Sequence, residues 1–442
     1  MAQRFPTWCG RVVGAAALLV ALAAGSAAAQ QPPLEAALSP EPEEPQEELA
    51  PANLTGAEAV LFGLHLGAAY VLSPLLEWGA EQGLLDGGPG SVGGFDIEPG
   101  SLGSNSGVGL EVGYVHFDEP VWAGASVGAT TKGYQEHSAF LGLRNTAGSR
   151  YARAQFTYDL DTEDEFSGLG MGTPEDSETD YRQEEFRILG DGQIDPARNV
   201  RVGLRGGYRK NNILPGKNDD FDDITEVFGD SLLDDPDGDF ILPGVSGEES
   251  DYAQGGAFVA FDSRNNSGNP SRGALVAGSF DAFRGVGDTP FDWNRFGGEF
   301  AGYLPLPDET RVIAVRIFGV HQDPLHGQPL VPFYYLSSIG GGSLLRSFSS
   351  FRFQDNDLLY GAAEFRRRVW TENAGLVAVD ASLFAESAGV YRDITDDVEF
   401  GDMEQSYGTE LRIVVPNDVV ARIGAAVGGE GAKFYVGGGG RF

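Results

Sequence analysis

The stretch GGGSLLRSFSSFRFQDNDLLYGAAEFRRRVW, residues 340–370, decides the fold class of this chain. It begins as a loop of Gly and Ser residues that carries one arginine, Arg346, among apolar neighbours. It ends as a strand in which Glu364, Arg366 and Arg368 occupy alternate positions, with Phe365 between the first two. Because strand side chains alternate with period two, the charges share one face and the apolar residues the other. A charged face opposite an apolar face is typical of a strand between a wet lumen and lipid.

The same alternation continues from residue 92 to residue 442. The candidate strands, each bounded by turn residues, are 92–102, 106–117, 121–132, 134–145, 149–161, 180–193, 199–213, 251–264, 271–285, 290–306, 310–322, 356–370, 374–391, 404–416, 418–429 and 431–442. The 64 glycines and 28 phenylalanines favour many short strands with aromatic girdles over a helical enzyme. We therefore expect an all-β fold, a transmembrane 16-stranded antiparallel β-barrel with an even strand number.

The lengths of the connections support this interpretation. Long acidic connections at 162–180, 214–250 and 392–404 follow the fifth, seventh and thirteenth strands, and the Arg346 loop follows the eleventh. All are odd-numbered connections and therefore leave the barrel at the same end. Short turns at one end and long loops at the other are the pattern of outer-membrane barrels. We expect the long acidic loops to face outward.

The N-terminal region has three expected parts. Residues 1–29 have the positive start (Arg4, Arg11), apolar run and small-residue cleavage site of a signal peptide, which favours export over a membrane-spanning helix. Cys9, the single cysteine, would leave with this segment. Residues 30–56 are Pro- and Glu-rich and read as a disordered tether. Residues 57–91 read as a helical segment at the periplasmic side, broken near Pro74, that acts as a packing helix or alternatively as a plug or membrane-surface anchor.

The charge balance excludes one class of partner. The chain has 65 Asp and Glu against 30 Lys and Arg, and nucleic-acid binding needs a basic surface. We expect no nucleic-acid partner.

Three motifs occur in a recognisable order. The first is the loop Leu345-Arg346-Ser347-Phe348, and the second is FDSRNNSGNPSRG at 261–273, with Asp262, Arg264, Pro270 and Gly273. The third is FAESAG at 384–389, with Glu386 in its centre. Together they resemble the bacterial surface-antigen superfamily of BamA/TamA-like outer-membrane barrels, over nearly all of 92–442. Ser347 stands where the family carries glycine, and Glu386 where it carries aspartate.

The resemblance implies a role for these residues. Arg346, followed by Phe348, would fold back into the barrel and pair with Glu386, with Glu364 or Asp380 nearby. Strand alternation independently places Asp380 and Glu386 on the polar face, and a buried arginine needs a carboxylate partner. The alternative is that Arg346 is a solvated loop residue.

The two strands that would close the barrel are poor in pairing groups. The last one carries Gly437, Gly438, Gly439 and Gly440, and the first carries Pro99, which has no N–H to donate. Phe442 ends the chain with an aromatic residue, which resembles the signal read by the outer-membrane assembly machinery. We expect a weak seam between these strands.

The function implied by the resemblance is insertion or translocation of polypeptide or lipid through this seam. The alternative is a passive pore or structural envelope protein that kept only the fold. Expected partners are outer-membrane lipid, the assembly machinery during biogenesis and a polypeptide substrate. A POTRA repeat, the substrate-handling module of the family, is not expected in residues 30–91.

Three other patterns are read as coincidental. GASVG at 124–128 fits a serine-hydrolase motif, but it lies within a strand and no helix follows. DPDGD at 235–239 lacks the sixth-position glycine and distal glutamate of an EF-hand. His321 and His326 have no second pair of metal ligands near them in the sequence. We expect no enzyme activity, cofactor or metal.

Overall fold

The computed structural model describes most of the chain beyond residue 51. The described residues are 52, 54–81, 95–100, 106–118, 120–145, 150–174, 177–218, 221–228, 242–245, 249–307, 310–342, 344–372, 375–396, 398, 400–416 and 418–437. The segments expected to be a signal peptide and most of the tether lie outside them. Gly438 to Gly440 and Phe442 also lie outside.

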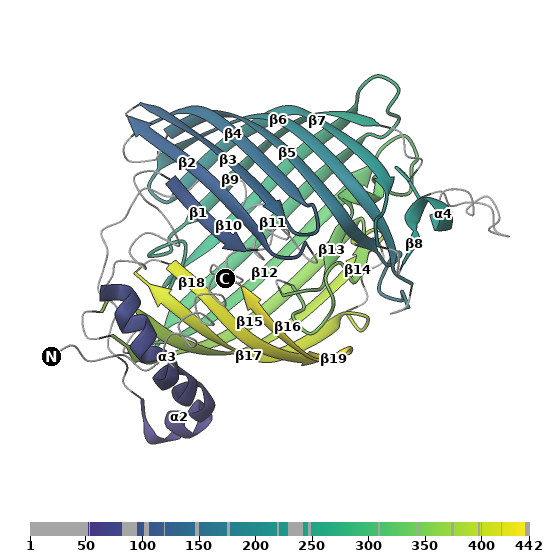
Figure 1. Ribbon diagram of the computed structural model, residues 1–442. Helices are drawn as coiled ribbons and strands as arrows, with labels where there is room; N and C mark the ends of the chain where they lie inside the picture. The colour runs from purple at the N-terminus through teal and green to yellow at the C-terminus, as the bar shows by residue number, and fades with distance from the viewer. Residues whose placement is uncertain are drawn as a thin grey trace.

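One large antiparallel sheet forms the wall, in which each strand pairs with the next along the chain (Figure 1). Its strands are β1 (Phe95–Gly100), β2 (Gly109–Asp118), β3 (Val121–Thr130), β4 (Gln135–Arg144), β5 (Arg150–Phe166), β6 (Thr179–Ala197), β7 (Val200–Pro215), β9 (Ser250–Asp262), β10 (Gly273–Gly285), β11 (Trp293–Pro305), β12 (Arg311–Pro324), β15 (Asp357–Thr371), β16 (Ala378–Tyr391), β17 (Glu404–Val415), β18 (Asp418–Gly428) and β19 (Gly431–Gly437). Each expected strand range overlaps one of these strands.

Two faces of the wall differ in exposure, as alternation predicts. Phe261, Val276, Phe300 and Ile317 lie opposite one another on four neighbouring strands, and all are 43–50% exposed. The next row on the other face is buried; it contains Ala260, Ala277, Glu299, Phe318 and Tyr360. The buried face is therefore the lumenal face, and the exposed apolar face is the outer one.

The core of the molecule lies in the lumen, because the β12–β15 connection folds inward. Leu344, Leu345, Phe348 and Phe353 of this connection are buried against the lumenal faces of β9 to β12, β15 and β16. The connection also contains a 3-10 helix, η4 (Phe333–Tyr335), and a hairpin of β13 (Ser337–Ile339) and β14 (Phe353–Asp355) that alternation did not predict. Strands of three residues are too short to show a period.

The long connections gather at one end of the sheet. The β7–β9 connection contains β8 (Asp222–Asp223), parallel to β6, and α4 (Ile224–Phe228). Phe333 packs against Phe166 of β5 and Tyr181 of β6, and Leu169 forms a bridge with Gln354. One expected boundary is wrong: β5 continues to Phe166, so Thr162 to Phe166 belong to a strand rather than to an acidic loop. A strand that continues beyond the membrane can carry hydrated carboxylates.

Two helices precede the wall, α2 (Gly56–Leu61) and α3 (Gly63–Glu81). A capping box between Thr55 and Glu58 starts α2, because each residue's side chain meets the other's backbone N–H. The expected break near Pro74 is wrong, since the helices part at Phe62 and Pro74 lies inside α3. Proline removes the N–H that would bond to the Tyr70 carbonyl, and the Ser73 hydroxyl donates to that carbonyl instead, at 3.1 Å.

The helices lie against the outer face of the wall (Figure 1). Phe62, Ala69 and Leu76 are buried against a cluster that includes Phe365, Ala381 and Ile413. The described part of this segment is therefore not a plug in the lumen. No described helix is long and apolar enough to cross a membrane.

Candidate functional site

The loop at 340–352 turns tightly inside the lumen. The Gly340 N–H donates to the Leu344 carbonyl and the Gly341 N–H to the Phe348 carbonyl, and both glycines have positive φ angles of 119° and 79°. Leu345, fully buried, has a φ of 61°, a left-handed conformation that a branched side chain rarely adopts. The packing of Leu345 in the core holds this strained turn, which presents Arg346 to the wall.

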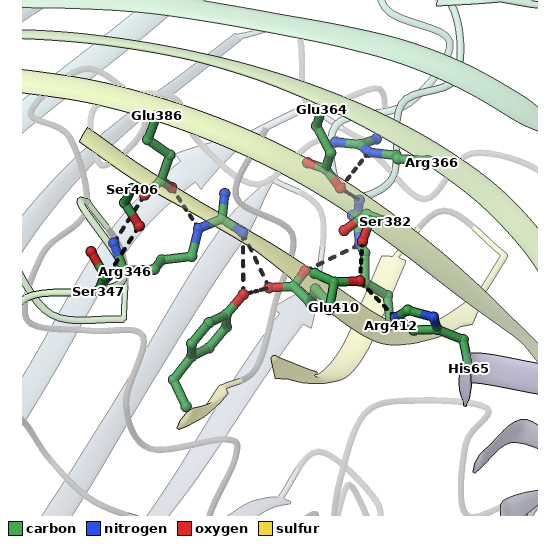
Figure 2. Close-up of polar contacts among 12 residues, drawn as sticks. His65, Arg346, Ser347, Glu364, Arg366, Ser382, Glu386, Ser406, Glu410 and Arg412 are labelled. Carbon is green, nitrogen blue, oxygen red and sulfur yellow. Dashed lines mark hydrogen bonds and ion pairs between the residues drawn. The ribbon is translucent and has the colours of Figure 1, made fainter. Parts of the chain in front are cut away.

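Arg346 is buried among groups that neutralise its charge (Figure 2). Its Nε donates to Glu386 Oε1 at 2.5 Å, and its backbone N–H donates to Glu386 Oε2 at 2.9 Å. Its Nη1 lies 3.4 Å from both Glu410 Oε2 and the Tyr435 hydroxyl. The guanidinium carbon also lies 3.5 Å from the centre of the Phe384 ring, which is cation–π geometry.

Three neighbouring rungs of the sheet supply these partners. One rung carries Glu386, Ser406 and Gly428 side by side on β16, β17 and β18. A Cβ on Gly428 would lie 2.1 Å from the Ser347 hydroxyl, so the loop needs a glycine there. The Ser347 N–H donates to the Ser406 hydroxyl at 3.1 Å.

The other two rungs also use glycine to make room for an aromatic ring. Phe384 lies opposite Gly408, where a Cβ would be 2.4 Å from the ring. On the third rung Glu410 lies opposite Gly424, and Gly424 lies opposite Tyr435. The Tyr435 ring lies across Gly424, where a Cβ would be 2.3 Å from the tyrosine hydroxyl, and this hydroxyl donates to Glu410 Oε2 at 2.9 Å.

The loop is fastened a second time, to the turn between β18 and β19. Glu430 in this turn accepts from the Ser349 N–H at 3.0 Å, from Arg352 Nε at 2.6 Å and from Lys433 Nζ at 2.7 Å. Through Glu430 and Tyr435 the loop therefore contacts the turn before β19 as well as β19 itself.

Electrostatics favour the charged form of both fastening groups. Burial alone would lower the pKa of Arg346, but the carboxylates of Glu386 and Glu410 hold that pKa well above its usual value. Burial alone would raise the pKa of Glu430, but Lys433, the Ser349 N–H and Arg352 lower it below 4.5. Both groups stay ionised at neutral pH, and the loop is held by charge-assisted hydrogen bonds.

Glu364 and Asp380 do not contact Arg346 directly. Glu364 pairs with Arg366 and Arg412 at 3.3 Å each (Figure 2), and Asp380 pairs with Arg368 at 2.8 Å. Arg412 Nε lies 4.0 Å from Glu410, so Arg366, Glu364, Arg412 and Glu410 form one connected line of alternating charge that leads to Arg346.

The second motif folds toward the same line of charges. Asp262 holds Arg264 through two side-chain hydrogen bonds of 3.0 and 2.8 Å, and Gly273 closes the turn with a φ of 97°. The Pro270 carbonyl accepts from Arg366 Nη1 at 3.0 Å. The β9–β10 turn and the β12–β15 loop are therefore joined through one charge network.

Sequence reasoning named Arg346, Phe348 and Glu386 but not Glu410, Tyr435, Phe384, Arg352 or Glu430 as site residues. Alternation places Glu410 on the polar face of its strand, which is the available signal. It does not give the register between strands, and the register decides which polar residues share a rung.

The seam residues are only partly described. Pro99 lies in β1 opposite Leu110 of β2, and Gly437 lies opposite Arg422 of β18. Within the described residues, β1 pairs with β2 and β19 with β18, and no register joins β1 to β19. Gly438, Gly439, Gly440 and Phe442 lie outside the described residues.

One group in the described part of the chain offers metal-ligand geometry. His321, Asp357 and Asp393 place three donor atoms within 4.8 Å of one another. Asp357 already accepts from His321 at 2.6 Å, from the Gln322 N–H at 2.7 Å and from the Ile394 N–H at 2.8 Å. These bonds fasten the β16–β17 loop to the wall.

An antiparallel wall whose inner face packs against an inward-folded loop is the architecture of an outer-membrane β-barrel protein. Residues 145–442, more than half of the chain, match the Omp85 superfamily domain. The chain therefore belongs to the Omp85 superfamily, whose barrels are outer-membrane proteins of Gram-negative bacteria. A comparison with curated protein sequences gives no match.

The comparison with solved structures gives matches at low sequence identity. BamA from Haemophilus ducreyi lacking POTRA domains 1–3 is 16% identical, with a TM-score of 0.55 over 78% of this chain and 69% of that chain. CdiB from Acinetobacter baumannii is 11% identical, with a TM-score of 0.43 over 77% and 58%. CdiB from Escherichia coli is 13% identical, with a TM-score of 0.46 over 76% and 60%. The chain thus spans less than two thirds of either CdiB chain.

Proposed function

We propose that this chain forms a closed 16-stranded barrel in the outer membrane and inserts or translocates polypeptide at the seam between β1 and β19. Omp85 barrels such as BamA and CdiB mediate protein insertion or secretion. That general role supports the proposal, and the specific one rests on the contacts of the lumenal loop.

The observation that carries the proposal is the double attachment of this loop to β19. Tyr435 lies in β19 and contacts both Arg346 and Glu410. Glu430, in the turn before β19, binds Ser349 and Arg352. A last strand held from inside the lumen does not depend on β1 for its position, so its outer edge can part from β1 without unfolding.

The chemistry of a free strand edge suits a polypeptide substrate. A strand edge presents unpaired N–H and C=O groups, and each such group costs several kcal/mol in lipid. An incoming strand satisfies these groups by adding to the sheet, which is β-augmentation. The proposed substrate is therefore an extended polypeptide segment, and outer-membrane lipid and the assembly machinery are proposed partners.

Locking the seam tests this function. In a Cys9→Ser background, one cysteine placed within 95–100 and one within 434–437 would join β1 to β19 by a disulfide. We expect the locked barrel to stay folded but to fail to restore outer-membrane protein levels in cells depleted of the native chain. Reduction of the disulfide should restore function.

A matched control separates the seam from any effect of crosslinking. Val112 and Val127 lie opposite each other on β2 and β3, which are already paired, so a disulfide between them should leave function intact. If the seam-locked barrel also restores function and conducts ions like the unlocked one, the proposal fails and a passive pore or structural protein is favoured.

A further inference from the structure

Helices α2 and α3 are apolar on the face that points away from the wall. Val60 is 84% exposed, Leu64 90%, Tyr70 70% and Val71 76%, and Leu61 is also exposed. The opposite face, with Phe62, Ala69 and Leu76, is buried against the wall. A helix that is apolar on both faces belongs in an apolar environment rather than at an aqueous surface.

The strand surface under these helices is the outer one. Ala381, Leu411, Ile423 and Val436 lie opposite one another on neighbouring strands and share one face of the wall. Ala381, Leu411 and Val436 belong to the cluster beneath the helices, and Ile423 is exposed on the same face. The adjacent rung, which carries Asp380, Arg412 and Arg422, faces the lumen. The helices therefore lie where the rest of the wall meets lipid.

One arginine on this outer surface, Arg367, is buried beneath α2 and lies beside a carboxylate of that helix. Arg367 lies opposite Arg311 on β12 and Ala381 on β16, so it shares the outer face, yet it is fully buried. Glu58 of α2 lies 3.4 Å from Arg367 Nε and accepts from Arg311 Nη2 at 3.0 Å. The Glu58 carboxylate therefore lies between the guanidinium groups of Arg311 and Arg367.

A second polar contact fixes the start of α3. His65 Nε2 lies 2.6 Å from the hydroxyl of Thr409 on β17 (Figure 2 shows His65 on the helix). That hydroxyl donates to the Ser382 carbonyl at 2.7 Å, so the histidine ring must be the donor to it. Arg311, Arg367 and Thr409, three outward polar residues of the wall, are thus each contacted by a helix side chain.

The exposed face of the helices continues the lipid-facing belt of the wall. Leu304 is 60% exposed and Ile313 39%, and the two lie opposite each other on β11 and β12. Ile313 in turn lies opposite Phe365, whose ring centre is 6.2 Å from that of Phe62. The apolar outer surface passes from the strands onto the helices without a polar border between these residues.

We propose that α2 and α3 lie within the membrane as a clasp on the outer wall of β15 to β18, with phospholipid acyl chains as the occupant of their exposed face. Glu58 and His65 fasten the clasp to Arg311, Arg367 and Thr409. The clasp keeps lipid away from a buried outward arginine and stiffens the strands next to β19.

Depth-dependent fluorescence quenching tests the position of the helices. Single cysteines at Leu64 and at Val71, in a Cys9→Ser background, would carry an environment-sensitive fluorophore in the full chain reconstituted into phospholipid vesicles. Doxyl-labelled phospholipid should quench both probes as strongly as a probe at Leu304 on the wall. Iodide, a water-soluble quencher, should act strongly only on a probe at Phe400, which is 74% exposed in the β16–β17 loop.

The results distinguish whether lipid, water or a second copy of the chain covers the exposed face of the helices. Quenching of the Leu64 and Val71 probes by iodide, or by neither reagent, overturns the proposal. Disulfides between chains at Leu64→Cys would also overturn it, because they would make this face an interface between two copies.

The fastening is tested by a probe beneath the helices. Leu383 lies on the outer face of β16 and packs in the helix cluster, so a probe on Leu383→Cys should be shielded from doxyl lipid. Glu58→Gln should expose it, because lipid replaces the released helix, whereas Glu226→Gln in α4 should not. If the Leu383 probe is quenched equally with and without Glu58→Gln, Glu58 does not fasten the clasp.

Discussion

At the scale of single residues, Arg346 shows how this barrel uses a buried charge. The guanidinium has left water entirely, and such a group is stable only with carboxylates and ring faces around it. Glu386 binds both its side chain and its backbone N–H, so this one carboxylate fixes the position of the loop as well as its charge.

The pair can be tested by a double-mutant cycle. Arg346→Met leaves Glu386 buried without its charged partner, and Glu386→Gln leaves the arginine short of one carboxylate. Breaking one side of a buried pair typically costs about 3–5 kcal/mol, so each variant should lower the urea midpoint of the folded barrel. The double variant should lose less than the sum, since neither charge is then orphaned. Arg150→Met at an exposed position is the control. Wild-type behaviour of all three variants would disprove the pairing.

Gly273 is a second residue whose role is set by backbone geometry. Its φ is 97°, and a Cβ there would lie 2.1 Å from the Ser263 carbonyl oxygen. Gly273→Ala should therefore destabilise the barrel by at least about 1–2 kcal/mol, measured in the same urea titration. Gly298→Ala in β11, where a Cβ would meet no atom within 4 Å, should change the midpoint little. Equal midpoints for the two variants would show that the β9–β10 turn adapts freely.

The attachment of Glu430 predicts a pH dependence. Its pKa is lowered below 4.5 in the folded chain, so its contribution is fully present above 4.5 and is lost as pH falls through the lower, folded value. The urea midpoint of wild type minus that of Glu430→Gln should be constant from about pH 7 to about pH 5 and shrink below that. A difference that is independent of pH down to about 3 would mean that the carboxylate does not hold the loop in its charged form.

At the scale of elements, strands were predictable because their signal is strictly periodic. Polar and apolar positions alternate over Glu364 to Arg366 of β15 and over Glu410 to Ile413 of β17, and the bounding turns carry Gly, Pro or Asp. The position of Arg346 near Glu386 was also predictable from the loop motif and the polar face of β16. What alternation lacks is the register between strands, which brings Glu410 and Tyr435 to the same rung.

The helices were harder to predict for a physical reason. Proline usually ends a helix because a carbonyl loses its partner, but the Ser73 hydroxyl replaces that partner within α3. On the outer wall the helices contact Arg367, which looks in sequence like one more charge in the run Arg366-Arg367-Arg368. Alternation places the middle arginine on the outer face, but only the structure shows that it is buried there beside Glu58 of α2.

At the scale of the whole molecule, the charge network joins parts that are far apart in sequence. Through Arg366 and Arg412 it links the β9–β10 turn to Glu364, and through Glu410 to the Arg346 loop and β19. The helices fasten the same strands from outside. Strands β15 to β19 are therefore held from both faces, whereas β1 is described only in its pairing with β2.

The final prediction concerns how the molecule sits in the membrane. The long connections β5–β6, β7–β9, β12–β15 and β16–β17 all leave one end of the sheet, whereas the short β11–β12 and β17–β18 connections leave the other. Short turns face the periplasm in outer-membrane barrels, because the chain is inserted from that side. An epitope tag inserted at 396–400 should therefore be reached by antibody on intact cells, and a tag at 416–417 only after the outer membrane is permeabilised. The same orientation places Glu58, next to Arg311, in the periplasmic half of the bilayer, so the clasp would contact the phospholipid leaflet. Labelling of the 416–417 tag on intact cells would reverse the orientation and, with it, the leaflet that α2 and α3 contact.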